Sequence, residues 1–420
     1  MTNILDELQW RGLVAQTTDD AGLRAAFNAG PVTYYTGYDP TAQSLHIGHL
    51  VQLLNMRRLQ LAGHRPIALV GGATGLIGDP RPTAERAMNT TDTVAEWVER
   101  IRVQIAPYLD SEGSNGVILV NNLEWTQELS AIDLLRDIGK HFRLGTMISK
   151  DIVARRLASD EGISYSEFSY QILQSYDFRE LHRRYGCTLQ SAGNDQWGNV
   201  VAGIEFARKT DSVGLFGLTS PLITKADGSK MGKSEGGAVW LDPTMVSPYT
   251  FYQYWLNTAD EDVIHYLKVF TFRTRDEIDA LQQEVQDKPF RREAQKALAG
   301  DLTALVHGED ALKAVVSAAQ ALFGRGDLRE LDAITVAGAV SELNSVIARP
   351  GDEWVDLFVG AGLAGSRGEA RRAVADGGAY VNNVKITSPD QVLASSDLLH
   401  GRYVVLRRGK KTLAVAEVSA

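Results

Sequence analysis

Strand-like and helix-like segments alternate between Pro31 and Val239, and this alternation limits the possible folds more than any other feature of the chain. The strand candidates read PVTYYTG, PIALVGG, GVILVNN and CTLQSAG, and each ends in small or polar residues where a helix can begin. Such alternation predicts a parallel sheet with crossover helices. Ligands bind beyond the carboxyl ends of the strands in these sheets, so we expect the functional residues there.

The rest of the chain shows a different pattern. The first crossover helix is expected to begin after Ser44, a suitable N-cap, and to run to about Ala62, with Gly63 as its stop signal. Between about 248 and 348, EDVIHYLKVFTF, RDEIDALQQEV and GDLTALVHGEDALKAVVSAAQALF are candidate helices. The last residues read as short helices followed by the strands GAYVNNVKI and YVVLRRGKKTLAVAEV. We therefore predict an α/β protein in four parts: a parallel-sheet domain at 1–220, a loop and linker at 221–247, an α-helical domain at 248–348 and a small α+β domain at 352–420.

Composition narrows the class of protein. With 420 residues, 44% hydrophobic and 23% charged, the chain is typical of a soluble globular protein of two or three domains. A net charge of −9 argues against a surface that coats nucleic acid throughout, although Arg402, Arg407, Arg408, Lys410 and Lys411 form a basic stretch. The single cysteine, Cys187, excludes an intramolecular disulfide and a cysteine-based zinc site. We find no signal peptide or membrane-spanning run and expect a cytoplasmic protein.

Two histidines three residues apart, His46 and His49, lie at the start of the first crossover helix in the stretch LHIGHLVQLL. The first N–H groups of a helix are unpaired and its dipole is positive there, so phosphate oxygens are attracted. Residues at i and i+3 share one face of the helix and can donate to the same anion. Gly48 leaves that face flat, so that a base can approach the backbone. The alternative is a pair of partly buried structural histidines.

A second group of candidates for phosphate binding lies in KADGSKMGKS, from Lys225 to Ser234, which holds three lysines and the glycines Gly228 and Gly232. On its own, such a run is most often a solvated surface loop. Mobile lysines are also what a reaction that expels pyrophosphate needs, because charge accumulates on the leaving group and a flexible loop can close on it.

These two motifs together resemble the signature pair of class I aminoacyl-tRNA synthetases, with Gly232 where the consensus has serine. The blocks YTGYDPTAQSLHIGHL, ALVGGATGLIGDP, EFSYQILQSYDF, GNDQWGN, PLITKADGSKMGKSEGGAVWL and SPYTFYQYWLNTAD resemble, in order, those of bacterial tyrosyl-tRNA synthetases. The resemblance implies a Rossmann-like catalytic domain with a dimer-forming insertion, a mobile loop and an anticodon-binding helical domain. It also implies that tyrosine and ATP, with Mg²⁺, form tyrosyl-adenylate and pyrophosphate, and that the tyrosyl group then passes to the terminal adenosine of tRNA(Tyr).

The same resemblance implies roles for individual residues. The residues expected to bind tyrosine are Tyr35, Asp79, Tyr170, Gln174, Asp177 and Gln196. The residues expected to hold ATP are Thr36, Asp39, Gly48, Gly193, Asp195 and Ser234. The residues expected at the phosphates and the departing pyrophosphate are Thr41, His46, His49, Arg86, Lys230 and Lys233. One departure is DPRPTAER, which is a residue shorter than the family pattern and offers Arg81 where the family has a lysine.

Recognition of the phenol is expected from Tyr35 and Asp177. An ionised aspartate accepts the phenolic proton, and a phenylalanine ligand would leave both polar groups unpaired in a buried pocket. Tyr34 is a competitor for Tyr35, but alternation places the two on opposite faces of the strand. The fixed distance to Asp39 and Pro40 in the family pattern selects Tyr35.

The segment from about 352 to 420 resembles a small RNA-binding fold first described in a ribosomal small-subunit protein. In SRGEARRAVADGGAYVNNVKI, Ser366 can cap a helix that carries Arg367, Arg371 and Arg372 on one side, where they would contact phosphates. The alternative is an ordinary charged helix face. The family also implies a homodimer, for which IDLLRDIGKHFRLGTMISKDIVARRL is the candidate contact, although core packing explains its amphipathic pattern equally well.

Three other functions stay open. Tryptophanyl-tRNA synthetases share the fold and the chemistry, and a phenol-sized pocket with Tyr35 and Asp177 separates the two. Small-molecule adenylyltransferases with similar histidine motifs would not need the RNA-binding tail. An RNA-binding or splicing protein on a retired synthetase scaffold would be expected to lose the phosphate-site residues, which this chain keeps.

Overall fold

The computed structural model describes residues 3–81, 88–229, 231–234, 237–324, 326–341, 343–409 and 412–418. The chain forms two compact units, one of Met1–Leu241 with Ile264–Ile278 and the other of Asp242–Val263 with Asp279–Ala420. The predicted division into four parts is a finer one and stays a prediction. No helix within the described ranges is long and apolar enough to cross a membrane.

The described part of the first unit contains a six-stranded sheet in the order β1-β6-β5-β2-β3-β4. All neighbouring strands are parallel except β1, which pairs antiparallel with β6 at the edge. The strands are β1 (Gln16–Thr17), β2 (Thr33–Tyr38), β3 (Arg65–Val70), β4 (Ile118–Asn121), β5 (Leu189–Gly193) and β6 (Phe216–Ser220). The four predicted strands are confirmed as β2 to β5. The chain adds β3 and β4 on one side of β2, and β5 and β6 on the other, so the strand order reverses at β2, where such sheets bind ligands.

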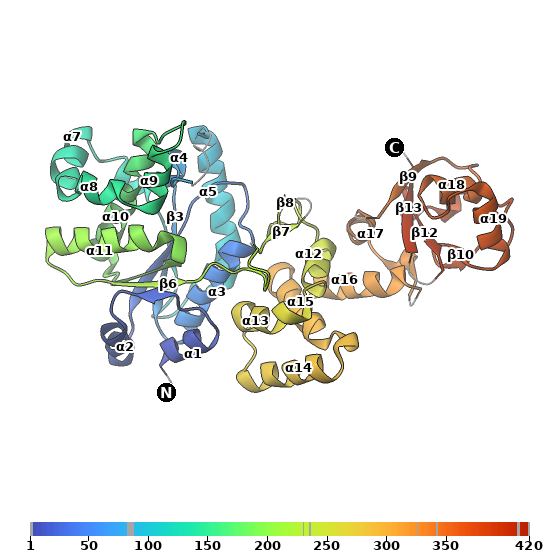
Figure 1. Ribbon diagram of the computed structural model, residues 1–420, viewed down its shortest axis with the longest axis horizontal. Helices are drawn as coiled ribbons and strands as arrows, with labels where there is room; N and C mark the ends of the chain where they lie inside the picture. The colour runs from blue at the N-terminus through green and yellow to red at the C-terminus, as the bar shows by residue number, and fades with distance from the viewer. Residues whose placement is uncertain are drawn as a thin grey trace. The chain divides into compact units, whose positions relative to one another are not determined.

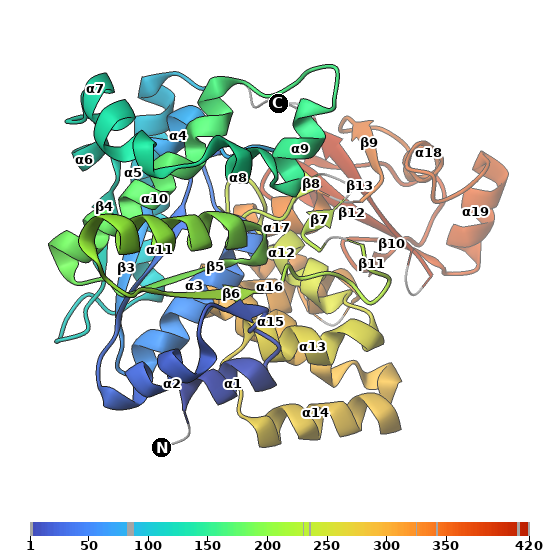
Figure 2. The same ribbon diagram turned by 60° about the vertical axis from the view of Figure 1, so that its left-hand side comes forward.

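Helices cover both faces of this sheet, with α3 and α5 on one side of the strands and α10 and α11 on the other (Figure 1). Figure 2 shows α11 along β5 and β6. The longer helices of the unit are α1 (Ile4–Trp10), α2 (Asp20–Ala29), α3 (Ile47–Leu61), α5 (Thr91–Ile105), α9 (Asp151–Leu157), α10 (Tyr165–Tyr185) and α11 (Trp197–Asp211). The shorter ones are α4 (Thr74–Ile77), α6 (Leu123–Thr126), α7 (Ala131–Asp133), a π-helical turn (Leu134–Ile138) and α8 (Leu144–Ile148). Cys187 is fully buried in the core between the sheet and α10, as expected of a small apolar residue, and burial raises the pKa of its thiol.

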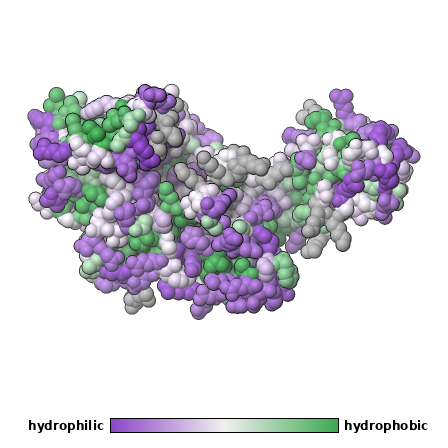
Figure 3. Space-filling view, in the orientation of Figure 1, coloured by the Kyte–Doolittle hydropathy of each residue, from purple (hydrophilic) through white to green (hydrophobic). Residues whose placement is uncertain are grey.

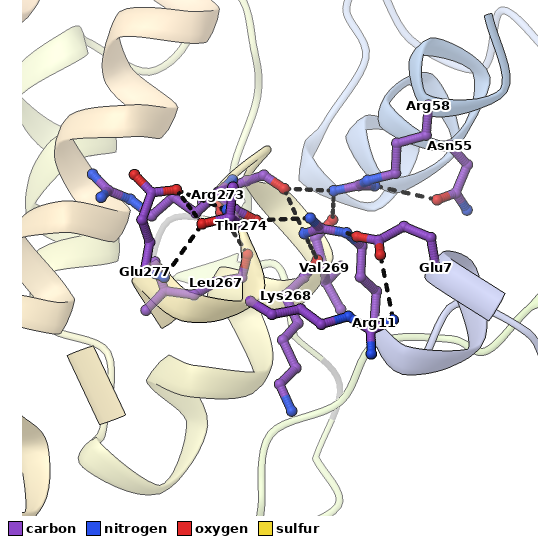
Figure 4. A network of polar contacts seen from close by, with 12 residues as sticks. Glu7, Arg11, Asn55, Arg58, Leu267, Lys268, Val269, Arg273, Thr274 and Glu277 are labelled. Atoms are coloured by element: carbon purple, nitrogen blue, oxygen red, sulfur yellow. Dashed lines mark hydrogen bonds and ion pairs between the residues drawn. The ribbon is translucent and has the colours of Figure 1, made fainter. Parts of the chain in front are cut away.

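Two buried arginines hold the end of α13 (Asp260–Phe270), a helix that begins in the second unit and ends in the first (Figure 4). Arg11 donates to the carbonyls of Lys268, Thr271 and Arg273 at 2.8–2.9 Å. Arg58, from α3, donates to the carbonyls of Val269 and Thr271 at 2.8 Å. The last carbonyls of a helix lack partners and carry the negative end of its dipole, so two guanidinium groups satisfy both needs. Burial lowers the pKa of Arg58 to about 9, so the group keeps its charge at neutral pH.

The second unit begins with helices. They are α12 (Pro248–Leu256), the first residues of α13, the later part of α14 (Arg275–Asp287), α15 (Glu293–His307), α16 (Glu309–Leu322) and α17 (Ala333–Val340). The predicted helical character of this region is confirmed. The longest candidate segment is interrupted at Gly308, whose φ of +90° ends α15 and starts α16, because a left-handed residue cannot continue a right-handed helix.

The chain ends in a five-stranded sheet of order β11-β10-β12-β13-β9 within the described residues. Its strands are β9 (Ser345–Ala348), β10 (Ala379–Val381), β11 (Val384–Lys385), β12 (Tyr403–Arg408) and β13 (Thr412–Val418). Helices α18 (Trp354–Gly360) and α19 (Arg367–Ala375) pack on it around one apolar core. The predicted helices and strands of the tail are confirmed, and β9, parallel to β13, was not predicted.

Candidate active site

A cleft of about 430 Å³ lies at the carboxyl ends of β2 and β5, beside the first turn of α3. Most of the residues predicted from the sequence line it, although they come from segments far apart in the chain. They are Tyr35, Asp39, Thr41, His46, Gly48, His49, Asp79, Tyr170, Gln174, Asp177, Gly193, Asp195 and Gln196, together with Arg81. The structure therefore brings the residues predicted to bind tyrosine, and most of those predicted to bind the nucleotide, into one cleft.

The carboxyl group of Asp177 is a buried polar group that lines the cleft. Trp125 Nε1 donates to Oδ1 at 2.7 Å and Asn122 Nδ2 donates to Oδ2 at 3.0 Å. Burial raises the pKa of Asp177 to about 7, against the effect of these two donors. The hydroxyl of Tyr35 is buried, lines the same cleft and has no hydrogen-bond partner in the described part of the chain. Tyr34 points to the other side of β2, where its hydroxyl donates to the carbonyl of Met56, so the predicted alternation is confirmed.

A second group of side chains in the cleft consists of amides, carboxylates and a tyrosine hydroxyl. Gln196 Nε2 donates to Asp79 Oδ2 at 2.8 Å and lies 3.2 Å from Asp195 Oδ2. The Tyr170 hydroxyl donates to Asp39 Oδ2 at 2.6 Å. The cleft therefore concentrates acidic and carbonyl oxygens, which suit a ligand with several N–H donors.

The two histidines of the motif form the cap of α3. His46 is the N-cap residue: its Nδ1 accepts from the Gly48 N–H at 3.0 Å. Its own N–H donates to His49 Nδ1 at 3.2 Å, and the two rings stack at 3.9 Å. The prediction of Ser44 as N-cap is wrong, because the helix begins at Ile47 and His46 supplies the acceptor that a serine usually gives.

This cap fixes the tautomers of both rings. Each Nδ1 accepts a backbone N–H, so each neutral ring carries its proton on Nε2 and can donate it. Burial lowers the pKa of both rings, that of His49 to about 3, so they stay uncharged at neutral pH. A Cβ at position 48 would lie 2.8 Å from the His46 ring, which explains why glycine separates the two histidines. The structure thus assigns the glycine a packing role in addition to the predicted flat face.

The chain that follows the lysine-rich segment returns to the start of α3. The Ile47 N–H donates to the Val239 carbonyl at 3.0 Å, and the Leu241 N–H donates to the Leu45 carbonyl at 2.9 Å. Earlier in the chain, after β6, the turn at Gly228 is followed by a hairpin of β7 (Lys233–Ser234) and β8 (Gly237–Ala238). Gly232, the departure from the consensus, has a φ of +94°, a conformation that favours glycine over serine.

A few predicted residues lie elsewhere or cannot be placed. Thr36 is buried and does not line the cleft. The backbones of Lys233 and Ser234 are described as part of β7. Arg86 and Lys230 lie outside the described residues.

Several residues that line the cleft were not predicted from the sequence, among them Tyr38, Gln52, Thr74 and Gln190. Gln52 follows His49 by three residues on α3, so helical periodicity carried a signal for it. Its Nε2 donates to Ser220 Oγ at 2.7 Å. Thr74 donates to Asp39 Oδ1 at 2.7 Å. Nothing in the local sequence distinguishes Gln190, which lines the cleft from β5 and whose buried Oε1 has no partner in the described residues.

The predicted RNA-binding helix is α19, and Ser366 caps it by accepting from the Glu369 N–H. Its arginines are exposed, but two of them pair with acids. Arg367 contacts Glu353 at 2.6 Å and Asp356 at 2.5 Å, and Arg371 lies 3.5 Å from Asp390. The charge that the third, Arg372, offers to a phosphate is therefore less compensated by ion pairs than that of Arg367.

Comparisons with known proteins agree with this geometry. A family model described as tRNA synthetases class I (W and Y) matches residues 28–324. A second, described as the tyrosine–tRNA ligase SYY-like C-terminal domain, matches residues 336–416. The tyrosine–tRNA ligase of Streptomyces coelicolor is 58% identical over 420 residues, which cover 100% of both chains. That of Kineococcus radiotolerans is 55% identical and covers 100% of this chain and 99% of its own length.

Solved structures give the same result. A C-terminally truncated mitochondrial tyrosyl-tRNA synthetase from Coccidioides posadasii matches with a TM-score of 0.66 and 32% identity, over 75% of this chain and 91% of that chain. A tryptophanyl-tRNA synthetase from Encephalitozoon cuniculi, bound to tryptophan, matches with a TM-score of 0.54 and 17% identity, over 74% of this chain and 87% of that chain, which shows a shared fold alone. The chain therefore belongs to the tyrosine–tRNA ligase family of the class I tRNA synthetases.

Proposed function

We propose that the cleft performs tyrosine activation by holding tyrosine and ATP side by side, with the phenol between Tyr35 and Asp177 and the ATP phosphates at the start of α3. The observation that carries this assignment is the buried Tyr35 hydroxyl, which lines the cleft without a partner in the described residues. An unpaired buried hydroxyl costs about 1–3 kcal/mol, and a bound phenol removes that cost while a phenylalanine ring does not. The site therefore selects for an aromatic alcohol.

The ammonium and carboxylate groups of tyrosine would bind at the amide and carboxylate side chains of the cleft. Asp79, Tyr170 and Gln174 would accept from the α-ammonium group. Gln196 would orient the carboxylate through its Nε2. Both assignments follow the positions of these side chains along one wall of the cleft.

ATP would bind across the helix start. Neutral His46 and His49 would each donate an Nε2–H to phosphate, and Thr41 would join them. The remaining groups assigned to the nucleotide are Asp39, Gly48, Gly193, Asp195 and Ser234. Thr36 is left out because it does not line the cleft. The departing pyrophosphate would be held by Lys230, Lys233 and Arg86, with Arg81 as a further cation on the cleft wall.

The chemistry then needs no nucleophilic side chain. The tyrosine carboxylate oxygen bonds to the α-phosphorus of ATP, the bond to the β-phosphate breaks, and pyrophosphate leaves. Catalysis comes from positioning and from donors aimed at the charge that develops on the phosphates. Among the described residues no group of three or more His, Cys, Asp or Glu is placed to hold a metal ion, and we expect Mg²⁺ to arrive on the phosphate oxygens of ATP.

The second substrate would be tRNA(Tyr), whose terminal adenosine takes the tyrosyl group from the adenylate. Helix α19, with Arg367, Arg371 and Arg372, is the assigned contact of the C-terminal region with RNA. We assign the anticodon to the helical region by family analogy. The cytoplasmic location stays a prediction from the sequence.

The protein would act as a homodimer. Large apolar side chains are exposed on the segment from α7 to α8, including Ile132, Leu135, Leu144 and Ile148, with exposed fractions of 43–64%. Figure 3 shows apolar side chains gathered over this segment. Exposed apolar patches of this kind mark protein interfaces, and a second copy of the chain is the occupant that the family implies.

Pyrophosphate exchange driven separately by tyrosine, phenylalanine and tryptophan tests the site. We expect exchange with tyrosine alone. In Tyr35→Phe and Asp177→Ala, the preference for tyrosine over phenylalanine should fall by roughly tenfold to a hundredfold, because each removes one partner of the phenol. An Asp177→Ala variant with unaltered affinity for tyrosine would contradict the assignment, and exchange driven by tryptophan would favour the other branch of the family.

A further inference from the structure

Asn199, on the first turn of α11, joins two of the substrate-binding amides. Its Nδ2 donates to Gln174 Oε1 and to Gln196 Oε1, both at 3.0 Å. A third oxygen, Asp79 Oδ1, lies 3.5 Å from the same nitrogen. One amino group therefore faces three acceptors on the wall of the cleft.

Lys150 determines which way the Asn199 amide points. Its Nζ lies 3.3 Å from Asn199 Oδ1, and an ammonium group has donors but no acceptor. The carbonyl end of Asn199 must face the lysine, so the amino end must face the glutamines. Burial lowers the pKa of Lys150 to about 8, while the charge of Asp79 raises it, so the ammonium form predominates at neutral pH. Gly198 leaves room for this contact, since a Cβ there would lie 3.0 Å from Nζ.

The orientation of the Asn199 amide determines the orientation of the Gln174 and Gln196 amides. With both glutamine Oε1 atoms bonded to Asn199, the Nε2 of Gln196 points at Asp79 and Asp195. If Asn199 turned over, its oxygen would face the oxygens of Gln174 and Gln196. Both glutamines would then have to rotate their amides as well, because two acceptors cannot form a hydrogen bond with each other.

We propose that Lys150 is a positioning residue for tyrosine activation, which acts through Asn199 to fix which ends of the Gln174 and Gln196 amides face the substrate. The inference rests on the proposed roles of the two glutamines. It adds a group that the sequence analysis did not select, 46 residues before Gln196 in the chain. Lys150 and Asn199 line a second cavity of about 380 Å³, which shares Asp79 and Asp195 with the cleft. Lys150 does not line the cleft itself, so it needs no contact with tyrosine.

The test is steady-state pyrophosphate exchange with full-length variants. In Lys150→Met, we expect the KM for tyrosine to rise about tenfold while the KM for ATP stays within twofold, because only the amides that hold the amino acid lose their orientation. Asn199→Leu should give the same effect, and the double variant should be no worse than either single one, since both remove the same chain of contacts. Lys150→Arg should restore the KM to within about threefold, because a guanidinium group is also a pure donor.

Arg155→Met is the matched control. Arg155 lies on α9, the helix that follows Lys150, lines the same cavity and carries the same charge, but it donates to the Asp151 carbonyl. We expect the tyrosine KM of Arg155→Met to match that of the unmodified protein. This variant loses a positive charge from the cavity but keeps the contact between Lys150 and Asn199, so it separates the two effects. Thermal unfolding midpoints of all variants monitor folding.

Three results would overturn the inference: an unchanged tyrosine KM in Lys150→Met, additive effects of the Lys150 and Asn199 substitutions, or a defect confined to transfer to tRNA. A Gln196→Met variant separates this failure from that of the proposed function. If Gln196→Met raises the tyrosine KM and Lys150→Met does not, only the role of Lys150 falls. If Gln196→Met is also silent, the proposed tyrosine site falls, and this inference falls with it.

Discussion

At the scale of single residues, the proposed recognition of tyrosine depends on the charge of Asp177. Two donors, from Trp125 and Asn122, stabilise its ionised form, and burial opposes them and dominates. A pKa of about 7 leaves both the ionised and the protonated form of Asp177 populated at neutral pH. A bound phenol adds a third donor and favours the carboxylate.

We predict that tyrosine affinity falls as the pH falls through about 7, approaching tenfold per pH unit below it, because the charge-assisted bond to the phenol is lost. Stability should change in the opposite sense. The folded state binds the proton more tightly than the unfolded chain, so this group's contribution to stability is fully present below about pH 4 and is lost as the pH rises through 7. Tyrosine titrations and urea unfolding between pH 5 and 9 measure both. Asp177→Asn should remove both dependences, and a pH-independent affinity in the unmodified protein would contradict the prediction.

The histidines of the α3 cap lead to a second prediction. Burial lowers the pKa of His46 and lowers that of His49 to about 3, so the His49 ring should gain no proton near pH 6.5. The KM for ATP should therefore show no ionisation of His49 between pH 6 and 8. Exchange kinetics at saturating tyrosine measure it. A break near pH 6.5 that disappears in His49→Asn would show that the rings bind phosphate as cations.

Residues differ in how far the sequence reveals them. Tyr35 and Tyr34 could be told apart because strand alternation is a local rule. The link between Lys150 and Asn199 could not be found, because 49 residues separate them and only tertiary packing brings a lysine to that amide. Gln52 is an intermediate case. Its helical spacing from His49 places it on the same face of α3, but it lies beyond the histidine motif from which the site residues were chosen.

At the scale of elements, a buried ion pair joins α9 and α10. Arg156 contacts Glu167 at 2.9 Å, and both side chains are at most 2% exposed. Arg156 also donates to the carbonyls of Gly162 at 2.9 Å and of Arg81 at 3.0 Å. It therefore connects α9 and α10 to the chain that follows Asp79.

We predict that Arg156→Met lowers the free energy of unfolding by about 3–5 kcal/mol, because it leaves Glu167 buried without its cation. Urea unfolding measures the effect. Arg100→Met is a control, since Arg100 pairs with Glu96 on the exposed side of α5, where ion pairs contribute at most about 1 kcal/mol. Similar losses in the two variants would show that burial of the pair carries no weight.

Element boundaries show where sequence rules stop. The strands β2 to β5 and the helices α13 to α16, apart from the break at Gly308, were predicted from the local sequence pattern, whereas α12 and α17 were not named as helices. The start of α3 did not, because a histidine took the capping role that Ser44 suggested. The strand β9 has four residues and is defined by its pairing with β13, a partner some 70 residues away, so its own sequence is a weak signal.

At the scale of the whole molecule, the proposed homodimer is open to direct measurement. Leu144→Asp places a charge in the apolar patch of α7 and α8 and should convert the dimer to monomers. Sedimentation equilibrium gives the mass. Val103→Asp, on α5, is the control, because Val103 is comparably exposed outside the patch. A dimer that persists in Leu144→Asp and dissociates in Val103→Asp would place the contact elsewhere.

The path of the chain through α13 has a consequence for dissection of the protein. The backbone passes from one unit to the other after Leu241, after Val263 and after Ile278. Neither unit is a continuous stretch of sequence, so no single cleavage releases either of them intact. Because Arg11 and Arg58 fasten the segment between the second and third passages, a fragment that stops at Leu241 would expose two guanidinium groups whose acceptors have been removed with the rest of the chain.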